Sequence, residues 1–218
     1  WLAGTLVEEA PIAPDWSQRA AAAVFRGSAT GGGVTAASNP RLRLCVLSAI
    51  WDRERRHDPP LLDAKLTSWN PRHKWGADGV VRVIDPRTAA PPLTAWDVGP
   101  HCRLTMQQQA AWKYYVLVDG NVGASRLGEL ATIGFVVFWV QSSLPQVALA
   151  WTGLEPWVHY IPVRADLLDL ETRLMWARRN DMRAQAMALA LQTHVRPRMA
   201  NMQQELAREV EAVGAPVA

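Results

Sequence analysis

Two segments far apart in the sequence carry the residue types that can bind a diphosphate. In each, an apolar stretch leads into glycines and an arginine: Val24 to Gly33, with Arg26, and Tyr114 to Arg126. A turn from a strand into a helix directs backbone N–H groups and the positive end of the helix dipole toward one point. An arginine adds a planar, permanently charged group that suits phosphate oxygens. The alternative for Gly31 to Gly33 is a flexible glycine loop beside a solvated arginine.

The secondary structure expected around these segments alternates between strands and helices. Apolar runs of strand length lie at Ala21 to Phe25, Leu61 to Leu66, Val80 to Ile84, Tyr114 to Val118, Phe135 to Val140 and Val158 to Val163. Helical patterns lie at Pro40 to Trp51, Thr105 to Trp112, Ala124 to Ala131, Leu167 to Ala177 and Arg183 to Val210. Asp166 is the expected cap of the fourth helix, and the last helix could break at Pro197.

This alternation predicts an α/β fold with a Rossmann-like, mainly parallel sheet flanked by helices. Such sheets bind ligands at the carboxyl ends of their strands. Both candidate segments follow a predicted strand, so both are expected at that edge.

Composition bounds the functional classes. The 218 residues are 49% hydrophobic, which is enough for a sizeable core. The net charge is +3 and the basic residues are scattered, so electrostatics gives no argument for nucleic acid. No apolar run reaches the roughly 18 residues of a transmembrane segment, and we expect no signal peptide within these residues. The chain begins at Trp1 rather than Met, which indicates a fragment or a processed chain, so the compartment and the oligomeric state stay open.

The residue types that bind metals lack the spacing for a metal site. Cys45 and Cys102 fit no metal motif, and Cys45 is expected to be a buried thiol. The histidines also lack metal spacing: His57, His73, His101, His159 and His194. No Asp-x-Asp pair occurs, and Gly31 to Gly33 lacks the Lys-Ser/Thr of a P-loop. We therefore predict no metal.

Four motifs resemble, in the right order, those of glycosyltransferase family 90, which includes capsule-associated fungal enzymes and protein O-glucosyltransferases. The similarity covers roughly residues 20 to 190, and the style of the motifs is also similar to copies in large DNA viruses and protists. The matching segments are Phe25-Arg26-Gly27-Ser28, Leu62 to Asn70, Lys113 to Arg126 and Pro156 to Val163. The last of them, Pro-Trp-Val-His-Tyr-Ile-Pro-Val, is long and specific.

The resemblance implies the C-terminal half of a GT-B glycosyltransferase, an architecture of two Rossmann-like domains facing a cleft. It implies an inverting, metal-independent transfer of a sugar, glucose or xylose above all, from a UDP-sugar to a hydroxyl of a protein or glycan acceptor. No cofactor is then needed besides the UDP-sugar substrate. Residues 1–20 would be a linker or the remnant of an acceptor domain, 21–182 the nucleotide-sugar-binding domain and 183–218 a C-terminal helical segment.

The same resemblance assigns the site residues. The implied pyrophosphate contacts are Arg26, Gly27, Ser28, Gly123, Ala124 and Arg126. The implied donor pocket includes Asp119, Gly120, Trp157 and His159, although a packing role explains Trp157 and His159 equally well. The two arginines would neutralise the charge that builds on the UDP leaving group, the role that a metal fills in other transferases.

The reaction also needs a general base to deprotonate the acceptor hydroxyl. In the family this carboxylate lies before the Phe-Arg-Gly-Ser motif, where the chain has only Glu8, Glu9 and Asp15, none in a convincing context. We expect the base outside this chain, so that the chain alone binds UDP-sugar but transfers poorly. Two alternatives stay open: a non-catalytic remnant that keeps the nucleotide-sugar pocket, and a polyanion-binding module.

Overall fold

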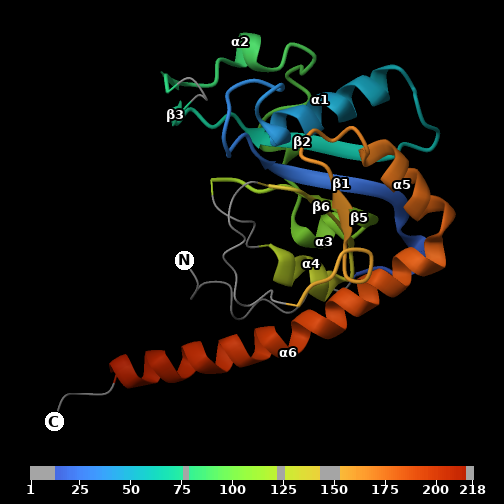
Figure 1. The fold of residues 1–218 in the computed structure, drawn as a ribbon, viewed down its shortest axis with the longest axis vertical. Helices are drawn as coiled ribbons and strands as arrows, with labels where there is room; N and C mark the ends of the chain where they lie inside the picture. Colours follow the sequence, from blue (N-terminus) through green and yellow to red (C-terminus); the bar gives the residue numbers. More distant parts are fainter. Residues whose placement is uncertain (1–12, 76–78, 122–125, 143–152, 215–218) are drawn as a thin grey trace.

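A five-stranded parallel sheet forms the centre of the molecule. The computed structural model describes residues 13–75, 79–121, 126–142 and 153–214. The strand order is β2-β1-β5-β6-β7, and all neighbouring strands run parallel (Figure 1). The strands are β1 (Ala20–Ser28), β2 (Leu62–Ser68), β5 (Trp112–Leu117), β6 (Val136–Val140) and β7 (Ile161–Val163). The predicted α/β fold with a helix-flanked, parallel sheet is confirmed.

Helices cover both faces of this sheet (Figure 1). The longer ones are α1 (Pro40–Arg53), α4 (Leu127–Ile133), α5 (Leu170–Arg179) and α6 (Asp181–Gly214). Helices α1 and α5 pack into one core and α4 into the other, while α6 contributes to both. Adjacent residues of β1 enter opposite cores, Phe25 the first and Val24 the second. Strands buried on both faces are expected to be continuously apolar, as β6 is. Among the described residues, no helix is long and apolar enough to cross a bilayer.

Local sequence signals set where the helices begin and end. The Asn39 side chain accepts hydrogen bonds from the backbone N–H groups of Arg41 and Leu42, at 3.0 and 3.2 Å, and Pro40 occupies the first position of α1. Gly134 ends α4 in the left-handed conformation, with φ of 81°. The cap at Asn39 places Arg41 next to the end of β1, where the glycine-rich loop begins.

Short elements fill the connection from β2 to β5. They are β3 (Lys74–Trp75), β4 (Val81–Arg82), α2 (Pro86–Ala89), the 3-10 helix η2 (Pro100–Cys102) and α3 (Met106–Gln109), and a further 3-10 helix, η1 (Trp16–Gln18), precedes β1. Strands β3 and β4 pair antiparallel in a separate two-stranded sheet, with Lys74 opposite Arg82. The hairpin matters for the site because Lys74 reaches back to the loop after β1.

The structure corrects several expected strands and the third helix. The strand expected at Val80 to Ile84 is reduced to the two residues of β4, whose side chains are exposed, because this hairpin lies outside the main sheet. The strand expected from Val158 begins at Ile161, after a turn in which Trp157 has a positive φ of 66°. The helix expected to reach Trp112 ends at Gln109, and Trp112 already belongs to β5.

Two expected helix boundaries were also wrong. The residue before α5 is Asp169 rather than Asp166, because the Asp166 carboxylate instead accepts from Leu168 N and pairs with Arg164. Helix α6 continues through Pro197 rather than breaking there. Near that proline, the Arg198 guanidinium donates to the carbonyl oxygen of His194 at 2.8 Å, one turn earlier. Ala124 and Ser125, the start expected for the helix that is α4, lie outside the described residues.

Candidate functional site

The loops after β1 and β5 meet at the carboxyl edge of the sheet. The two strands are neighbours, so the chain segments that leave them run side by side. The backbone N–H of Gly31 donates to the Asn121 side chain at 2.9 Å. A Cβ atom on Gly120 would lie 2.9 Å from Thr30 Oγ1, so the loops approach too closely there for a side chain. The structure thus brings together the two segments that the sequence singled out.

Arg126 joins the second loop to the end of β1. Its Nη1 donates to the carbonyl oxygen of Arg26 and to the Tyr115 hydroxyl, both at 2.9 Å. The residue is exposed and immediately precedes α4. The Arg126 guanidinium is therefore anchored to β1 and β5 at the carboxyl edge, in a residue that is exposed overall.

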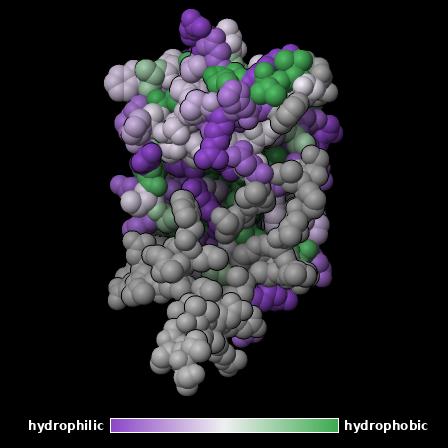
Figure 2. Space-filling view, turned by 90° about the vertical axis from the view of Figure 1, so that its left-hand side faces the viewer, coloured by the Kyte–Doolittle hydropathy of each residue, from purple (hydrophilic) through white to green (hydrophobic). Residues whose placement is uncertain are grey.

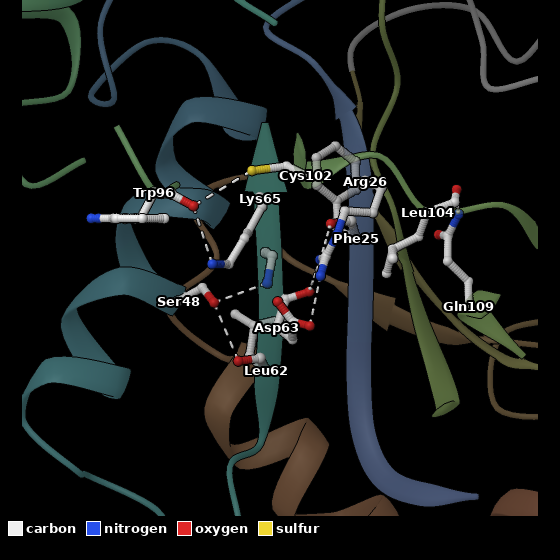
Figure 3. A network of polar contacts seen from close by, with 11 residues as sticks. Phe25, Arg26, Ser48, Leu62, Asp63, Lys65, Trp96, Cys102, Leu104 and Gln109 are labelled. Atoms are coloured by element: carbon white, nitrogen blue, oxygen red, sulfur yellow. Dashed lines mark hydrogen bonds and ion pairs between the residues drawn. The ribbon is translucent and has the colours of Figure 1, made fainter. Parts of the chain in front are cut away.

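Arg26 lies on the sheet, bound to β2 (Figure 3). Its Nη2 forms a 2.7 Å ion pair with Asp63, and its Nη1 donates to the carbonyl oxygens of Phe25 and Asp63. The Arg26 side chain is only 7% exposed, and its Nε has no hydrogen-bond partner among the described residues. Both Nη groups are thus engaged within the protein, and direct contact of Arg26 with a pyrophosphate stays a prediction.

Gly27 and Ser28, the next two residues of the motif, contribute to the site through their backbone. Gly27 is buried at the end of β1, and a Cβ there would lie 3.0 Å from the ring of Phe25. The carbonyl oxygen of Ser28 accepts a hydrogen bond from Arg41. Gly123 and Ala124, the other backbone contacts implied for a pyrophosphate, lie outside the described residues.

Arg41 is a cation of this site that the sequence analysis missed. Its Nε donates to the carbonyl oxygen of Asp119 at 3.0 Å, its Nη1 to that of Ser28 at 3.2 Å, and its Nη2 to that of Val118 at 2.8 Å. Burial lowers the pKa of the Arg41 guanidinium, and the charge of Arg126 also lowers it. The available signal was its place in the first turn of a helix after a glycine run, the same pattern that identified Arg126.

Lys74 is the second missed cation. The residue is buried, and its Nζ donates to the carbonyl oxygens of Ala29 at 2.9 Å and Gly31 at 2.5 Å. Burial lowers the pKa of the Lys74 ammonium, and the charge of Arg41 lowers it further. No local pattern marks this lysine, because it comes from the loop between β2 and β5 and its partners are backbone atoms.

The four cations give the carboxyl edge an excess of positive charge: Arg26, Arg41, Lys74 and Arg126. Asp63 balances Arg26, and the Asp119 carboxylate acts on the charge of Arg41. Figure 2 views the molecule from this side, where hydrophilic residues spread over the middle of the coloured surface. Cations combined with close-packed glycine loops form an environment suited to a small, multiply charged anion.

Trp157 and His159 lie elsewhere. Both precede β7, and in a parallel sheet the residues before a strand lie at the amino edge, opposite the cation cluster. The Trp157 ring packs under the Arg173 guanidinium, 4.6 Å from its Cζ, and meets the Trp176 ring at 5.2 Å. His159 accepts at Nδ1 from the backbone N–H of Glu155. The structure does not bring these two residues to the loops, so their place in a donor pocket stays a prediction.

Metal ligands and upstream carboxylates are the remaining features that the sequence analysis considered for this site. The described residues contain no group of three or more His, Cys, Asp or Glu side chains placed to hold a metal ion. Cys45 is fully buried, and burial raises the pKa of its thiol. Of the upstream carboxylates, Asp15 precedes η1, and Glu8 and Glu9 lie outside the described residues.

Comparison with known proteins gives the same family that the motifs resemble. The family model of glycosyl transferase family 90 matches residues 3–204. An uncharacterized protein of invertebrate iridescent virus 3 is 40% identical over 174 residues, which cover 79% of this chain and 14% of the viral protein. Protein O-glucosyltransferase 1 of Rattus norvegicus is 32% identical over 178 residues, 79% of this chain and 36% of the rat protein. Protein O-glucosyltransferase 2 of Danio rerio is 42% identical over 85 residues, 39% of this chain and 17% of the fish protein.

The chain therefore spans a minor part of each of these relatives, from 14% to 36% of their length. The match to the family model nevertheless runs through the whole sheet and into α6. This protein belongs to glycosyltransferase family 90.

Proposed function

We propose that this chain is the donor-binding part of a GT-B glycosyltransferase that moves a sugar from a UDP-sugar to a hydroxyl of a protein. The observation that carries the proposal is the convergence of two glycine loops and four cations at one edge of the sheet. Relatives named protein O-glucosyltransferase support glucose as the sugar and a protein as the acceptor. Xylose as the sugar and a glycan as the acceptor are the other expectations from the motifs.

The chemistry follows from the charges at the site. Transfer breaks the bond between the anomeric carbon of the sugar and a diphosphate oxygen, and negative charge then builds on the leaving UDP. We infer that Arg126 and Arg41 neutralise that charge, in the place of the divalent metal that other transferases use, and their contacts with the two loops support this role. Attack by the acceptor hydroxyl on the opposite face of the sugar inverts the configuration at the anomeric carbon. The base for that hydroxyl is not assigned to a residue of this chain.

The proposal is tested by calorimetric titration of UDP into the protein, with and without EDTA. Binding should survive EDTA, and Arg126→Ala should weaken it by about 2 kcal/mol, or roughly 30-fold, the usual cost of a lost hydrogen bond to a charged group. Arg179→Ala is the matched control, because it removes the same charge from an exposed position in the last turn of α5. Arg179→Ala should leave UDP affinity unchanged.

A second variant separates charge from local structure. Tyr115→Phe removes the hydroxyl that holds Arg126 but keeps the arginine, so it should weaken UDP binding less than Arg126→Ala. Absence of UDP binding by the folded wild-type chain would contradict the proposal and favour a remnant without a working nucleotide site. Equal losses for Arg126→Ala and Arg179→Ala would point to a nonspecific effect of net charge.

A further inference from the structure

Arg41 lies outside the four family motifs, yet its guanidinium donates to backbone oxygens at the ends of both β1 and β5. It occupies the second position of α1, where the Asn39 cap fixes the backbone. Its guanidinium donates to the carbonyl oxygen of Ser28, the last residue of β1, and to those of Val118 and Asp119, the first residues after β5. One side chain therefore ties together the ends of two neighbouring strands.

Two glycines make room for this guanidinium, and each comes from a different motif. A Cβ on Gly27 would lie 3.4 Å from Arg41 Nη1, and a Cβ on Gly120 would lie 3.0 Å from Arg41 Nη2. On another side, the Phe25 ring lies 5.7 Å from the Arg41 Cζ. A methyl group at Gly120 would be closer to the guanidinium than ordinary van der Waals contact allows. The spacing of the two loops and the position of Arg41 thus depend on each other.

We propose that Arg41 is a positioning residue of the diphosphate site: its guanidinium, held between Gly27 and Gly120, sets the distance between the two loops. The inference rests on the proposed function and deepens it. A guanidinium is a rigid planar fork whose N–H groups point in fixed directions, and here three of its nitrogens meet carbonyl oxygens of both loops. A lysine in this place would keep the charge but present a single nitrogen, so it could not hold both strand ends.

Lys74 provides an internal comparison, because it holds one loop only. Its Nζ donates to the carbonyl oxygens of Ala29 and Gly31, both in the loop after β1. Loss of Lys74 should therefore loosen that loop, whereas loss of Arg41 should loosen both.

Hydrogen exchange on the free protein tests the positioning directly. In Arg41→Lys, amides in residues 29–33 and 118–121 should both exchange about tenfold faster or more, since local opening then costs less free energy. In Lys74→Met, only residues 29–33 should change. Unchanged exchange in either segment of Arg41→Lys would overturn the proposal, whatever the protein binds.

UDP titration then tests what the positioning is for. Arg41→Lys and Arg41→Ala should each weaken UDP binding at least about tenfold, a loss in the range for charge-assisted contacts. Arg43→Gln is the matched control: Arg43 lies in the same turn of α1, but its guanidinium donates to the carbonyl oxygens of Ala36, Ala37 and Ala165. The UDP affinity of Arg43→Gln should stay within about twofold of the wild-type value. Thermal unfolding should show that every variant is folded.

The possible failures are distinguishable. If wild type binds UDP and Arg41→Lys binds it equally well, the positioning role is overturned and the proposed function stands. If wild type binds no UDP, the proposed function fails, and with it the diphosphate role of Arg41. The exchange result would still decide whether Arg41 couples the loops.

Discussion

The two edges of the sheet both gather cations, which are bound by carboxylates in some cases and by carbonyl oxygens in others. At the amino edge, Lys113 forms a 2.8 Å ion pair with Asp181, and Arg56 pairs with Glu171 at 2.9 Å. At the carboxyl edge, Arg41 and Lys74 are bound to backbone carbonyl oxygens. A carboxylate cancels a positive charge, whereas a carbonyl dipole only solvates it. Carbonyl oxygens also bind Arg19 and Arg178 at the amino edge, and Asp63 pairs with Arg26 on the side of the carboxyl edge, so both kinds of contact occur at both edges. The difference is that Arg41 and Lys74, the cations that contact the two loops, have carbonyl oxygens as their hydrogen-bond acceptors among the described residues.

The ion pairs at the two edges differ in burial, and this should give the largest difference in stability. The carboxylates of Asp63 and Glu171 are almost equally exposed, at 30% and 29%, but their arginine partners are 7% exposed for Arg26 and 48% for Arg56. Asp63→Ala leaves a buried cation without its partner, so it should cost about 3 kcal/mol of unfolding free energy. Glu171→Ala should cost about 1 kcal/mol or less. Urea unfolding measures both, and equal costs would contradict the assignment of Arg26 as the buried partner.

Glycines at the two edges should differ by a smaller amount. Gly33, in the carboxyl-edge loop, has φ of 79°, and a Cβ there would lie 2.4 Å from the carbonyl oxygen of Ser38. Gly134, in the turn before β6, has φ of 81° with nothing within 4 Å of a Cβ. Gly134→Ala should therefore cost only the left-handed backbone strain of about 1 kcal/mol. Gly33→Ala adds a clash with backbone and should cost about 2 kcal/mol.

Thermal unfolding of both glycine variants, with UDP titration alongside, separates the two effects. Gly33→Ala should also weaken UDP binding, because the displaced loop belongs to the proposed site. Gly134→Ala should leave UDP affinity at the wild-type value. If Gly134→Ala lost more UDP affinity than Gly33→Ala, the placement of the UDP site at the carboxyl edge would be contradicted.

The smallest expected effect is a pH dependence at the carboxyl edge. Burial lowers the pKa of Lys74 below 10.5, so between its folded-state pKa and 10.5 the unfolded chain binds more protons than the folded one. The unfolding free energy contributed by this lysine should then rise as the pH rises through that window. The difference in stability between wild type and Lys74→Met, measured by urea unfolding at several pH values, should shift in favour of wild type. A difference that does not change with pH would show that the Lys74 ammonium pays no burial penalty.

The sequence predicted the fold well because β1, β5 and β6 contain long apolar runs. It also found Arg126 and the two loops, since a strand, a glycine turn and an arginine lie within one short segment. Arg41 and Lys74 were missed for a physical reason. Their partners are backbone carbonyl oxygens, which the sequence does not reveal, so the local pattern around Arg41 did not show what its side chain contacts. The contact between Arg41 and Asp119 spans 78 positions.

Two residues of the longest motif show what a sequence motif does not predict. A motif identifies residues but does not say at which end of a strand they lie. Trp157 and His159 are placed by the start of β7 at Ile161, and their side chains pack against helices rather than loops. The sequence also could not predict that β4 is short and exposed, because valines next to one another are apolar whether or not a sheet covers them.

The bonds of Arg41 to main-chain oxygens have a consequence for mutational tolerance. Every amino acid supplies the same carbonyl oxygen, so substitutions at Ser28, Val118 or Asp119 leave the acceptors of Arg41 in place as long as the backbone keeps its path. The positions that tolerate few substitutions are then Gly27 and Gly120, where a side chain has no room, and Arg41 itself. In a library of random variants, the loops around the site should accept many residue types, while those three positions should accept almost none.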